Sequence, residues 1–357
     1  MKKLSLISAD SHVNPPVSFW KDYLPSKFRN DAPRLESTAE DDFVVFEGKR
    51  NPARILSAMA GKKYEDYKVV GKIEETRPGG WDPQERLKDM ALDGIDAEVI
   101  YGGGPLKTQN AELRVASHRA YNDWLADFCR VAPDRFVGMA YLPMTDIELA
   151  VTEAKHAVQN GLRGVIIPMV PPGKPYHDQS YGVLWKTLED LAAPAHIHTG
   201  VGSPRLNGAD EFFPYMVMSK LGLAEPITLF IFSGILQRHP RLRLVTVEGG
   251  VSWFAYLVNY MDHIWVRHRY WTNCVISEPP SYYFHRQVSG TFMDDPPGVR
   301  ERHTIGVENI MWSSDYPHAE TTWPHSREYI DRHFVDVPEE EKHKIICGNA
   351  ANLYHIT

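Results

Sequence analysis

The chain has 357 residues, of which 43% are hydrophobic and 24% charged, and its formal net charge is -7. This balance is typical of a soluble globular protein with one large core, and it offers no basic face for nucleic acid. The three scattered cysteines indicate a reducing cytoplasm and not a disulfide framework. No apolar run reaches the ~20 residues of a membrane span. We therefore expect a cytoplasmic protein without a nucleic-acid or membrane partner.

Short apolar runs alternate with helix-like segments along the chain. Amphipathic segments at 111–130, 146–159 and 181–191 are predicted as helices. Eight alternations predict a (β/α)8 TIM barrel, one domain over residues 1–357, with its site at the C-terminal ends of the strands. The predicted strands are 4–8, 97–101, 136–142, 164–168, 195–198, 242–247, 288–292 and 309–312.

Residues 13–90 interrupt this alternation with a long irregular insertion after the first strand. The segment is rich in proline and charged residues and is too long for a simple connector. Excursions of this kind usually serve as lids or as contacts between subunits. We expect the insertion to cover the barrel mouth, and we expect a homodimer or a higher oligomer.

Acidic and histidine residues stand at the ends of three predicted strands. Asp10 and His12 follow the first strand, His196 and His198 lie in the fifth, and Asp315 follows the eighth. A closed barrel brings these strand ends to one rim, where carboxylates and imidazoles bind a divalent ion such as zinc, manganese or iron. Taken singly, each residue is as well explained by a turn cap or a buried core histidine. The ordered set is what predicts a metal site.

Several longer motifs, in this order and spacing, resemble the amidohydrolase-related family, in the branch that contains aminocarboxymuconate-semialdehyde and resorcylate-type decarboxylases. They are ISADSHVNPP, PAHIHTG, SGILQRHPRLRLVTVEGGVSWF, VENIMWSSDYPHAETTWP and CGNAANLY, and they span essentially the whole chain. The resemblance implies a metal-dependent distorted barrel. It also implies that the ligands here are Asp10, His12, His198 and Asp315, with His196 supporting or completing the site.

Two positions depart from the family pattern. Asp10 stands where the family has histidine or glutamate, which favours manganese or iron over zinc. Glu248 ends the sixth strand, where many family decarboxylases carry a histidine, and a carboxylate is no cationic anchor for a substrate. Glu248 is instead a candidate general base, a partner of a ligating histidine, or a ligand to a second metal together with His263. A helix-capping ion pair is the alternative.

Three further residues are candidates for contact with the substrate. Arg205 lies in the loop after the fifth strand and is a candidate for binding a carboxylate, and His318 follows the eighth strand. Trp312, with Trp253 and Trp323, is a candidate for an aromatic pocket wall, although tryptophans more often pack in cores.

These residues predict an enzyme that acts on a small aromatic or carboxylated molecule. The main hypothesis is a metal-dependent hydrolase, in which Asp315 or Glu248 deprotonates a metal-activated water and His263 is a further catalytic candidate. The first alternative is a non-oxidative decarboxylase in which Asp315 protonates the ring carbon. The second is a two-metal, iron-containing oxygenase. A scaffold subunit without turnover is the non-enzymatic alternative.

Overall fold

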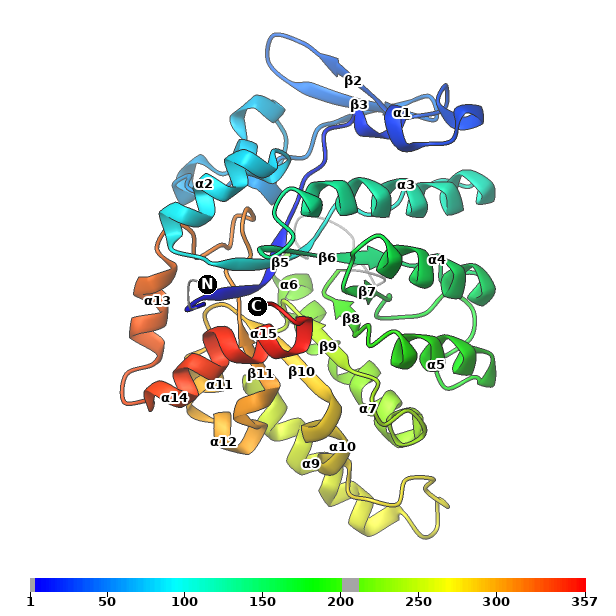
Figure 1. The fold of residues 1–357 in the computed structure, drawn as a ribbon, viewed down its shortest axis with the longest axis vertical. Coiled ribbons are helices and arrows are strands. Elements are labelled where there is room, and N and C mark those ends of the chain that lie inside the picture. The colour runs from blue at the N-terminus through cyan, green and yellow to red at the C-terminus, as the bar shows by residue number, and fades with distance from the viewer. Residues whose placement is uncertain (1–3, 201–211) are drawn as a thin grey trace.

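The computed structural model describes residues 4–200 and 212–357. At its centre, eight parallel strands lie side by side in the order of the chain, and helices surround them (Figure 1). This arrangement confirms the predicted α/β barrel. The strands are β1 (Ile7–His12), β5 (Ala97–Tyr101), β6 (Phe136–Tyr141), β7 (Gly164–Ile166), β8 (Ala195–His198), β9 (Leu244–Val247), β10 (Val288–Phe292) and β11 (Ile310–Trp312).

The barrel closes through the backbone that follows its last strand. The amide of Asp315 donates to the carbonyl of Asp10 at 3.0 Å, and the amide of His12 donates to the carbonyl of Tyr316 at 2.6 Å. The amide of Ser314 also donates to the hydroxyl of Ser8 at 2.9 Å. These bonds join the first strand to the end of the last one at the level of Asp10 and His12.

The first strand lies further along the chain than the sequence predicted. It covers Ile7–His12 instead of 4–8, so Asp10 and His12 lie inside the strand and are buried. Its pairing with β5 shifts register between Ser8 and Ser11. The hydrophobic pattern missed the second half of this strand because its buried residues are polar, which is typical of a functional site.

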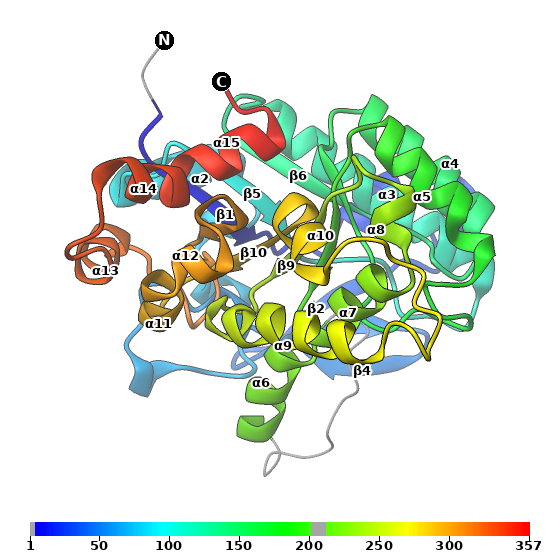
Figure 2. The same ribbon diagram turned by 90° about the horizontal axis from the view of Figure 1, so that it is seen from below.

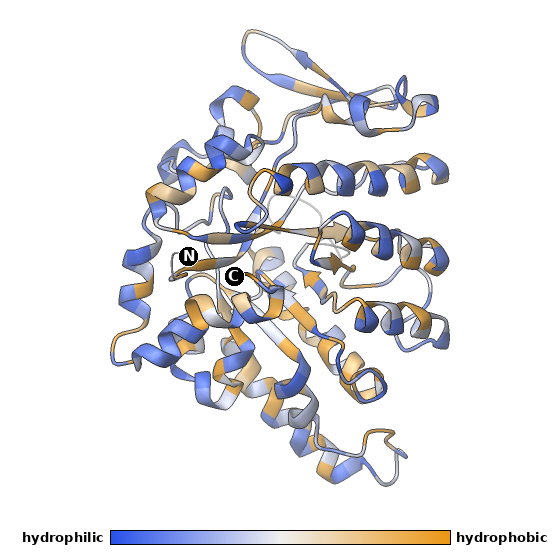
Figure 3. Cartoon of the chain, in the orientation of Figure 1, coloured by the Kyte–Doolittle hydropathy of each residue, from blue (hydrophilic) through white to orange (hydrophobic). Residues whose placement is uncertain are grey.

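Helices cover the outside of the barrel. Figure 3 shows hydrophobic residues along the strands and a mixture of hydrophobic and hydrophilic residues on the helices. Asn110 and Asp146 cap two of the predicted helices by accepting from the amides of Leu113 and Glu148. The helices after β5 are α3 (Ala111–Arg130), α4 (Ile147–Gln159), α5 (Gly182–Asp190), α6 (Phe212–Leu221), α7 (Ala224–Phe232), α8 (Ile235–Arg238), α9 (Ser252–His268), α10 (Pro280–Gln287), α11 (Pro296–Arg300), α12 (Arg302–Ile305), α13 (Ser326–His333), α14 (Glu339–His343) and α15 (Asn349–Tyr354).

The insertion after β1 is more regular than its sequence suggested. It begins with the short helix α1 (Phe19–Tyr23) and contains an antiparallel sheet of β2 (Arg34–Ser37), β3 (Asp42–Phe46) and β4 (Lys49–Pro52). It ends in the helix α2 (Pro83–Asp93), which our sequence analysis left in the irregular segment. The start and stop signals of α2 are present, because Asp82 caps its first turn and Gly94 ends it at φ 73°.

Between the small sheet and α2, the insertion reaches the loop after β11. The amide of Ala60 donates to the carbonyl of Pro317 at 3.0 Å, and the hydroxyl of Tyr67 donates to the carbonyl of Ala319 at 2.5 Å. Residues 54–67 therefore lie against the segment that follows the last barrel strand.

Helix α6 projects from the barrel (Figure 2) and exposes apolar side chains, of which Phe213 is 78% exposed. The helical stretch Phe212–Phe232 is long and apolar enough to cross a membrane by length and composition, which the sequence analysis did not expect. Its second half packs into the core through Ile227 and Phe230, whereas only 28% of its most apolar 18 residues are buried. The predicted homodimer stays a prediction.

A buried guanidinium ties α2, β5 and the end of β1 together. Arg86 is fully buried, and its Nε donates to Glu98 Oε2 at 2.6 Å. Its Nη1 donates to the carbonyls of His12 at 2.7 Å and Gly79 at 3.2 Å. Because removal of one partner leaves the other buried charge unpaired, such a pair is costly to break. Arg86 thereby fixes the backbone of a residue in the predicted metal site.

We expect Arg86→Met to lower the free energy of unfolding by about 3–5 kcal/mol, because Glu98 would stay buried without its partner. Urea-induced unfolding followed by circular dichroism measures this loss. Arg130→Met is the control, because it removes an exposed ion pair with Asp127 and should cost less than about 1 kcal/mol. Equal losses in the two variants would contradict the importance of the buried pair.

Candidate metal centre

Four strand ends bring five of the predicted site residues to one rim. Asp10 and His12 come from β1, and His198 is the last residue of β8. Glu248 directly follows β9, and Asp315 follows β11. All but Glu248 are buried, and the Glu248 side chain is 12% exposed.

The two residues that follow strands have left-handed backbone conformations. Glu248 has φ 59° and Asp315 has φ 56°, values that are uncommon for residues other than glycine. The amide of Glu248 donates to Thr291 Oγ1 at 2.9 Å, which fixes the turn. Such conformations persist only where the surrounding structure holds them, and they gather at functional sites.

His12 lies at the centre of the cluster. Its Nε2 is 3.2 Å from Asp10 Oδ1 and 3.0 Å from Asp315 Oδ1. His198 Nε2 is 3.4 Å from the same nitrogen and 3.6 Å from Glu248 Oε2. The histidine and carboxylate groups at the ends of four barrel strands thus converge on one small volume.

His318 joins the cluster from the loop after β11. Its ring stacks on the His12 ring with centroids 3.8 Å apart, and its Nδ1 is 3.0 Å from Asp315 Oδ1. It was predicted as a substrate contact, and the structure places it beside the predicted ligands, at the mouth of the site.

The cluster requires positive charge among its carboxylates. Burial opposes the ionisation of Asp10 and Asp315, but the charges of His12, His198 and His318 outweigh it and hold the pKa of each carboxyl below its usual range. Burial favours the neutral His12 ring, yet Asp10 and Asp315 raise the pKa of His12 to about 10. A proton on His12 meets the requirement, and a divalent cation would meet it more fully.

The residues present fit a divalent metal ion. Both carboxylate oxygens of Asp10 and of Asp315 are buried, and within the described chain they have no hydrogen bond of normal geometry. Buried acceptors of this kind are costly unless a cation or water satisfies them. One set of ligand atoms, all within 4.8 Å of one another, comes from Asp10, His12, His198 and Glu248, and a second comes from His12, Glu248, Asp315 and His318.

The structure separates the two histidines of β8. His196 is buried away from the cluster, with Nδ1 3.1 Å from the carbonyl of Val165 and Nε2 2.9 Å from the hydroxyl of Tyr354. Burial lowers the pKa of His196 to about 3, so the ring is neutral. His198, and not His196, presents a nitrogen to the cluster.

Two other predicted site residues, His263 and Trp312, lie outside the cluster. His263 is on the exposed face of α9, where it stacks on Tyr260 and contacts Arg267, so it does not reach Glu248 as the second-metal hypothesis requires. Trp312 is fully buried in β11, which places it in the core instead of a pocket wall. Arg205 lies outside the described residues.

The sequence did not predict a lysine that lies beside the candidate metal centre. Lys220 of α6 places its Nζ 3.1 Å from the carbonyl oxygen of Glu248 and 3.4 Å from its Oε1. The same nitrogen is 3.6 Å from Glu320 Oε2. A lysine in an apolar helix carries no local signal for such a role, because the contact joins distant parts of the chain.

An apolar cavity of about 480 Å³ opens beside the cluster. Its walls come from residues 54–67 of the insertion, from α6 and from the loop after β11. The insertion therefore contributes a wall of the barrel mouth, where it was expected. The lining includes Leu56, Tyr67, Phe212, Met216, Glu248, Asp315 and His318.

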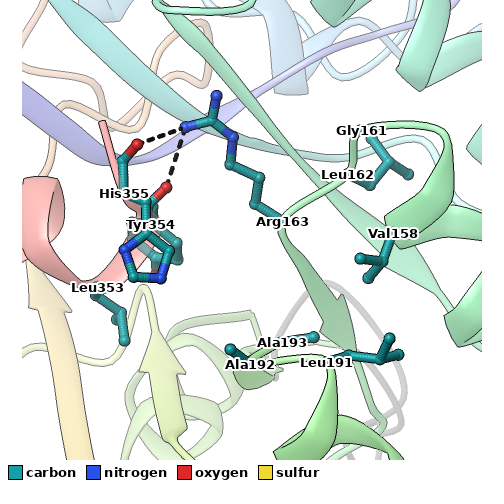
Figure 4. A pocket seen from close by; sticks show the side chains of 10 residues that line it. All are labelled: Val158, Gly161, Leu162, Arg163, Leu191, Ala192, Ala193, Leu353, Tyr354 and His355. Atoms are coloured by element: carbon teal, nitrogen blue, oxygen red, sulfur yellow. Dashed lines mark hydrogen bonds between the residues drawn. The ribbon is translucent and has the colours of Figure 1, made fainter. Parts of the chain in front are cut away.

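A smaller cavity of about 280 Å³ lies at the opposite end of the barrel (Figure 4). It is bounded by residues that precede β7 and β8 and by the last residues of α15. There Arg163 Nη1 donates to the carbonyls of Tyr354 at 3.0 Å and His355 at 3.2 Å. These bonds attach the C-terminal helix to the barrel, so the cavity is part of a structural contact.

Comparison with protein families places the chain in a known family. The amidohydrolase family model matches residues 9–356, and the chain belongs to that family.

Two curated relatives are decarboxylases. The chain is 29% identical over 191 residues to 2-amino-3-carboxymuconate-6-semialdehyde decarboxylase from Dictyostelium discoideum, with 51% of this chain and 52% of that protein covered. It is 25% identical over 298 residues to gamma-resorcylate decarboxylase from Rhizobium sp., with 76% and 86% covered. The chain thus spans about half the length of the first relative and most of the second.

Solved structures share the fold. An amidohydrolase from Mycobacterium avium subsp. paratuberculosis superposes with a TM-score of 0.77 at 19% identity, over 99% of this chain and 100% of that one. 5-Carboxyvanillate decarboxylase from Sphingomonas paucimobilis gives 0.68 at 21% identity, over 99% and 100%. Dihydroxybenzoic acid decarboxylase from Polaromonas sp., whose structure contains bound manganese, gives 0.67 at 18%, over 99% and 98%.

These comparisons correct the expectation of hydrolysis, because the curated relatives are decarboxylases. The main argument against decarboxylation was that Glu248 replaces a cationic residue on the sixth barrel strand. The structure answers part of that argument, since the ammonium group of Lys220 lies against Glu248, although Lys220 does not line the cavity. The positive charge is present at the strand end and comes from α6.

We expect His12→Ala to lower the bound metal to a small fraction of the wild-type content, because this residue belongs to both ligand sets. Elemental analysis of dialysed protein measures the content per chain. His263→Ala is the matched control, because it removes an exposed imidazole outside the cluster. Full metal content in His12→Ala would remove this histidine from the site.

Proposed function

We propose that the protein is a metal-dependent carboxy-lyase that removes the carboxyl group of a small aromatic acid without a redox change. The observation that carries this proposal is the buried carboxylate and imidazole cluster beside an apolar cavity. The decarboxylase relatives support it. A single aromatic ring suits the cavity, because small-molecule sites are mostly apolar with a few polar groups that fix orientation.

A divalent metal held by Asp10, His12, His198 and Asp315, with Glu248 beside them, would supply a Lewis acid for the substrate's oxygens. We propose manganese as that metal, because the set mixes carboxylates with imidazoles and a relative by fold contains manganese. Lys220 neutralises part of the negative charge of Glu248 and Glu320, which limits their repulsion of an acidic substrate.

Asp315 and His318 are suited to deliver a proton. Decarboxylation adds a proton to the ring carbon, after which the carbon–carbon bond breaks, its electron pair returns to the ring and carbon dioxide leaves. His318 Nδ1 lies 3.0 Å from Asp315 Oδ1, so the imidazole can pass a proton to the carboxylate that faces the cavity. The apolar walls exclude water and favour the change from an anionic carboxylate to neutral carbon dioxide.

We expect the manganese-loaded protein to release carbon dioxide from hydroxylated benzoic acids. In deuterium oxide, the product should carry one deuterium at the former carboxyl position, because the proton replaces the lost group. Nuclear magnetic resonance of the product measures this incorporation. Asp315→Asn should abolish it, whereas Asp127→Asn, on the exposed surface, should leave it unchanged. Turnover of esters or amides without any release of carbon dioxide would contradict the proposal.

We expect Glu248→Gln to lower turnover by about 10- to 100-fold, the range found when a supporting group of a metal site is lost. The substitution keeps the size of the side chain and removes the charge next to His198 and Lys220. Steady-state rates, with metal content measured in parallel, test this expectation. Glu308→Gln removes an exposed partner of Lys344 and serves as the control. A fully active Glu248→Gln variant would show that Glu248 has no part in catalysis.

A further inference from the structure

A second cavity opens at the C-terminal ends of β5, β6 and β7, on another part of the barrel mouth. Its volume is about 820 Å³, and it shares no lining residue with the cavity beside the metal cluster. The backbone after β5, the segment after β6 and the first turns of α3 form its walls. Nothing in the proposed decarboxylation uses this cavity.

The two cavities differ in charge. The metal cavity is lined by three carboxylates, those of Glu248, Asp315 and Glu320, and by one guanidinium, that of Arg54. Among the described residues, the charged side chains that line the second cavity are both basic, Lys107 and Arg114. Its lining therefore favours an anion, whereas the cluster favours a cation.

Arg114 is the unusual residue of this cavity. Its Nη1 donates to the carbonyl of Thr108 at 3.3 Å, while its Nε is buried and finds no acceptor in the described chain. No carboxylate of the described residues lies within ion-pair distance of its guanidinium. The other arginines of α3 differ, since Arg119 pairs with Glu153 at 2.7 Å and Arg130 pairs with Asp127.

A buried donor on an unpaired guanidinium needs a partner, because an unsatisfied polar group in such a place is costly. Glu47, which accepts a hydrogen bond from Thr108, forms no ion pair with Arg114. His118, one turn further along α3, is buried and has its Nδ1 2.8 Å from the carbonyl of Arg114. Burial lowers the pKa of His118, so the ring is neutral and adds no charge to the lining.

The rest of the lining is apolar and aromatic. Leu106, Leu142 and Met144 contribute aliphatic walls, and Tyr141 contributes a ring that packs edge-on against Tyr121 with centroids 5.4 Å apart. A cavity with apolar walls and an arginine that has no ion pair among the described residues suits an organic anion with a flat apolar body. A guanidinium binds a carboxylate through two parallel hydrogen bonds.

We propose that this cavity is a second binding site for an aromatic carboxylate, with the carboxylate on Arg114 and the ring against Tyr141 and Met144. The choice of an aromatic acid as the ligand rests on the proposed function, but the presence of an anion site does not. The site shares no lining residue with the metal cavity and contains none of the clustered ligands.

Calorimetric titration of the manganese-loaded protein with benzoate tests this site. We expect an Arg114-dependent binding event, which Arg114→Gln weakens by at least about tenfold, since a hydrogen bond between charged groups contributes that much. Arg130→Gln removes the same charge from the same helix, at a position away from the cavity, and should leave the event unchanged. A separate event that depends on the metal and not on Arg114 reports the decarboxylation site. If the protein is not a decarboxylase of aromatic acids, only the metal-dependent event should be missing, and the Arg114-dependent event should remain.

Two results would overturn the proposal. One is benzoate binding of unchanged affinity in Arg114→Gln. The other is displacement of benzoate by an equal concentration of inorganic phosphate, which would show a site for anions in general. Should Arg114→Gln fail to fold, Arg114→Lys keeps the charge and loses the paired hydrogen bonds, so it should still weaken benzoate binding severalfold. Wild-type affinity in Arg114→Lys would then count against the proposal.

Discussion

Two backbone hydrogen bonds join the first barrel strand to the segment after the last one, and the metal centre depends on them. The bonds from Asp315 to Asp10 and from His12 to Tyr316 place two carboxylates on either side of one imidazole. Burial of Asp10 and Asp315 around one imidazole is unfavourable unless positive charge offsets the repulsion between the two carboxylates. Barrel closure and assembly of the site are therefore one event, and Arg86 secures it by holding the carbonyl of His12.

The charged side chains in and around the cluster come from both the strands and a helix of the barrel. The strands supply Asp10, His12 and His198, while the positive charge beside Glu248 comes from Lys220 on a helix. This division makes a carboxylate at the end of β9 compatible with the acidic substrate that we propose. The local field depends on the sum of nearby groups and not on the residue at one strand position.

The barrel strands could be predicted from the sequence because buried parallel strands are short apolar runs at regular spacing. The cluster could be predicted because its members stand at the ends of those runs. The choice between the two histidines of β8 could not, since it depends on the hydroxyl of Tyr354, a contact 158 residues away. Lys220 was missed for the same reason. The helix α2 was missed although Asp82 and Gly94 mark both its ends, because the surrounding prolines and charges masked its pattern.

The insertion after β1 lines the cavity beside the metal but contributes none of the clustered ligands. Its residues 54–67 are held against the loop after β11 by the backbone bond of Ala60 and by the hydroxyl of Tyr67, and none of their side chains belongs to the cluster. Substitutions in this segment can reshape the substrate-facing wall while the chemistry stays intact. Because this wall and the ligands lie on different segments of the chain, substrate specificity can change through substitutions in residues 54–67 while the enzyme stays active.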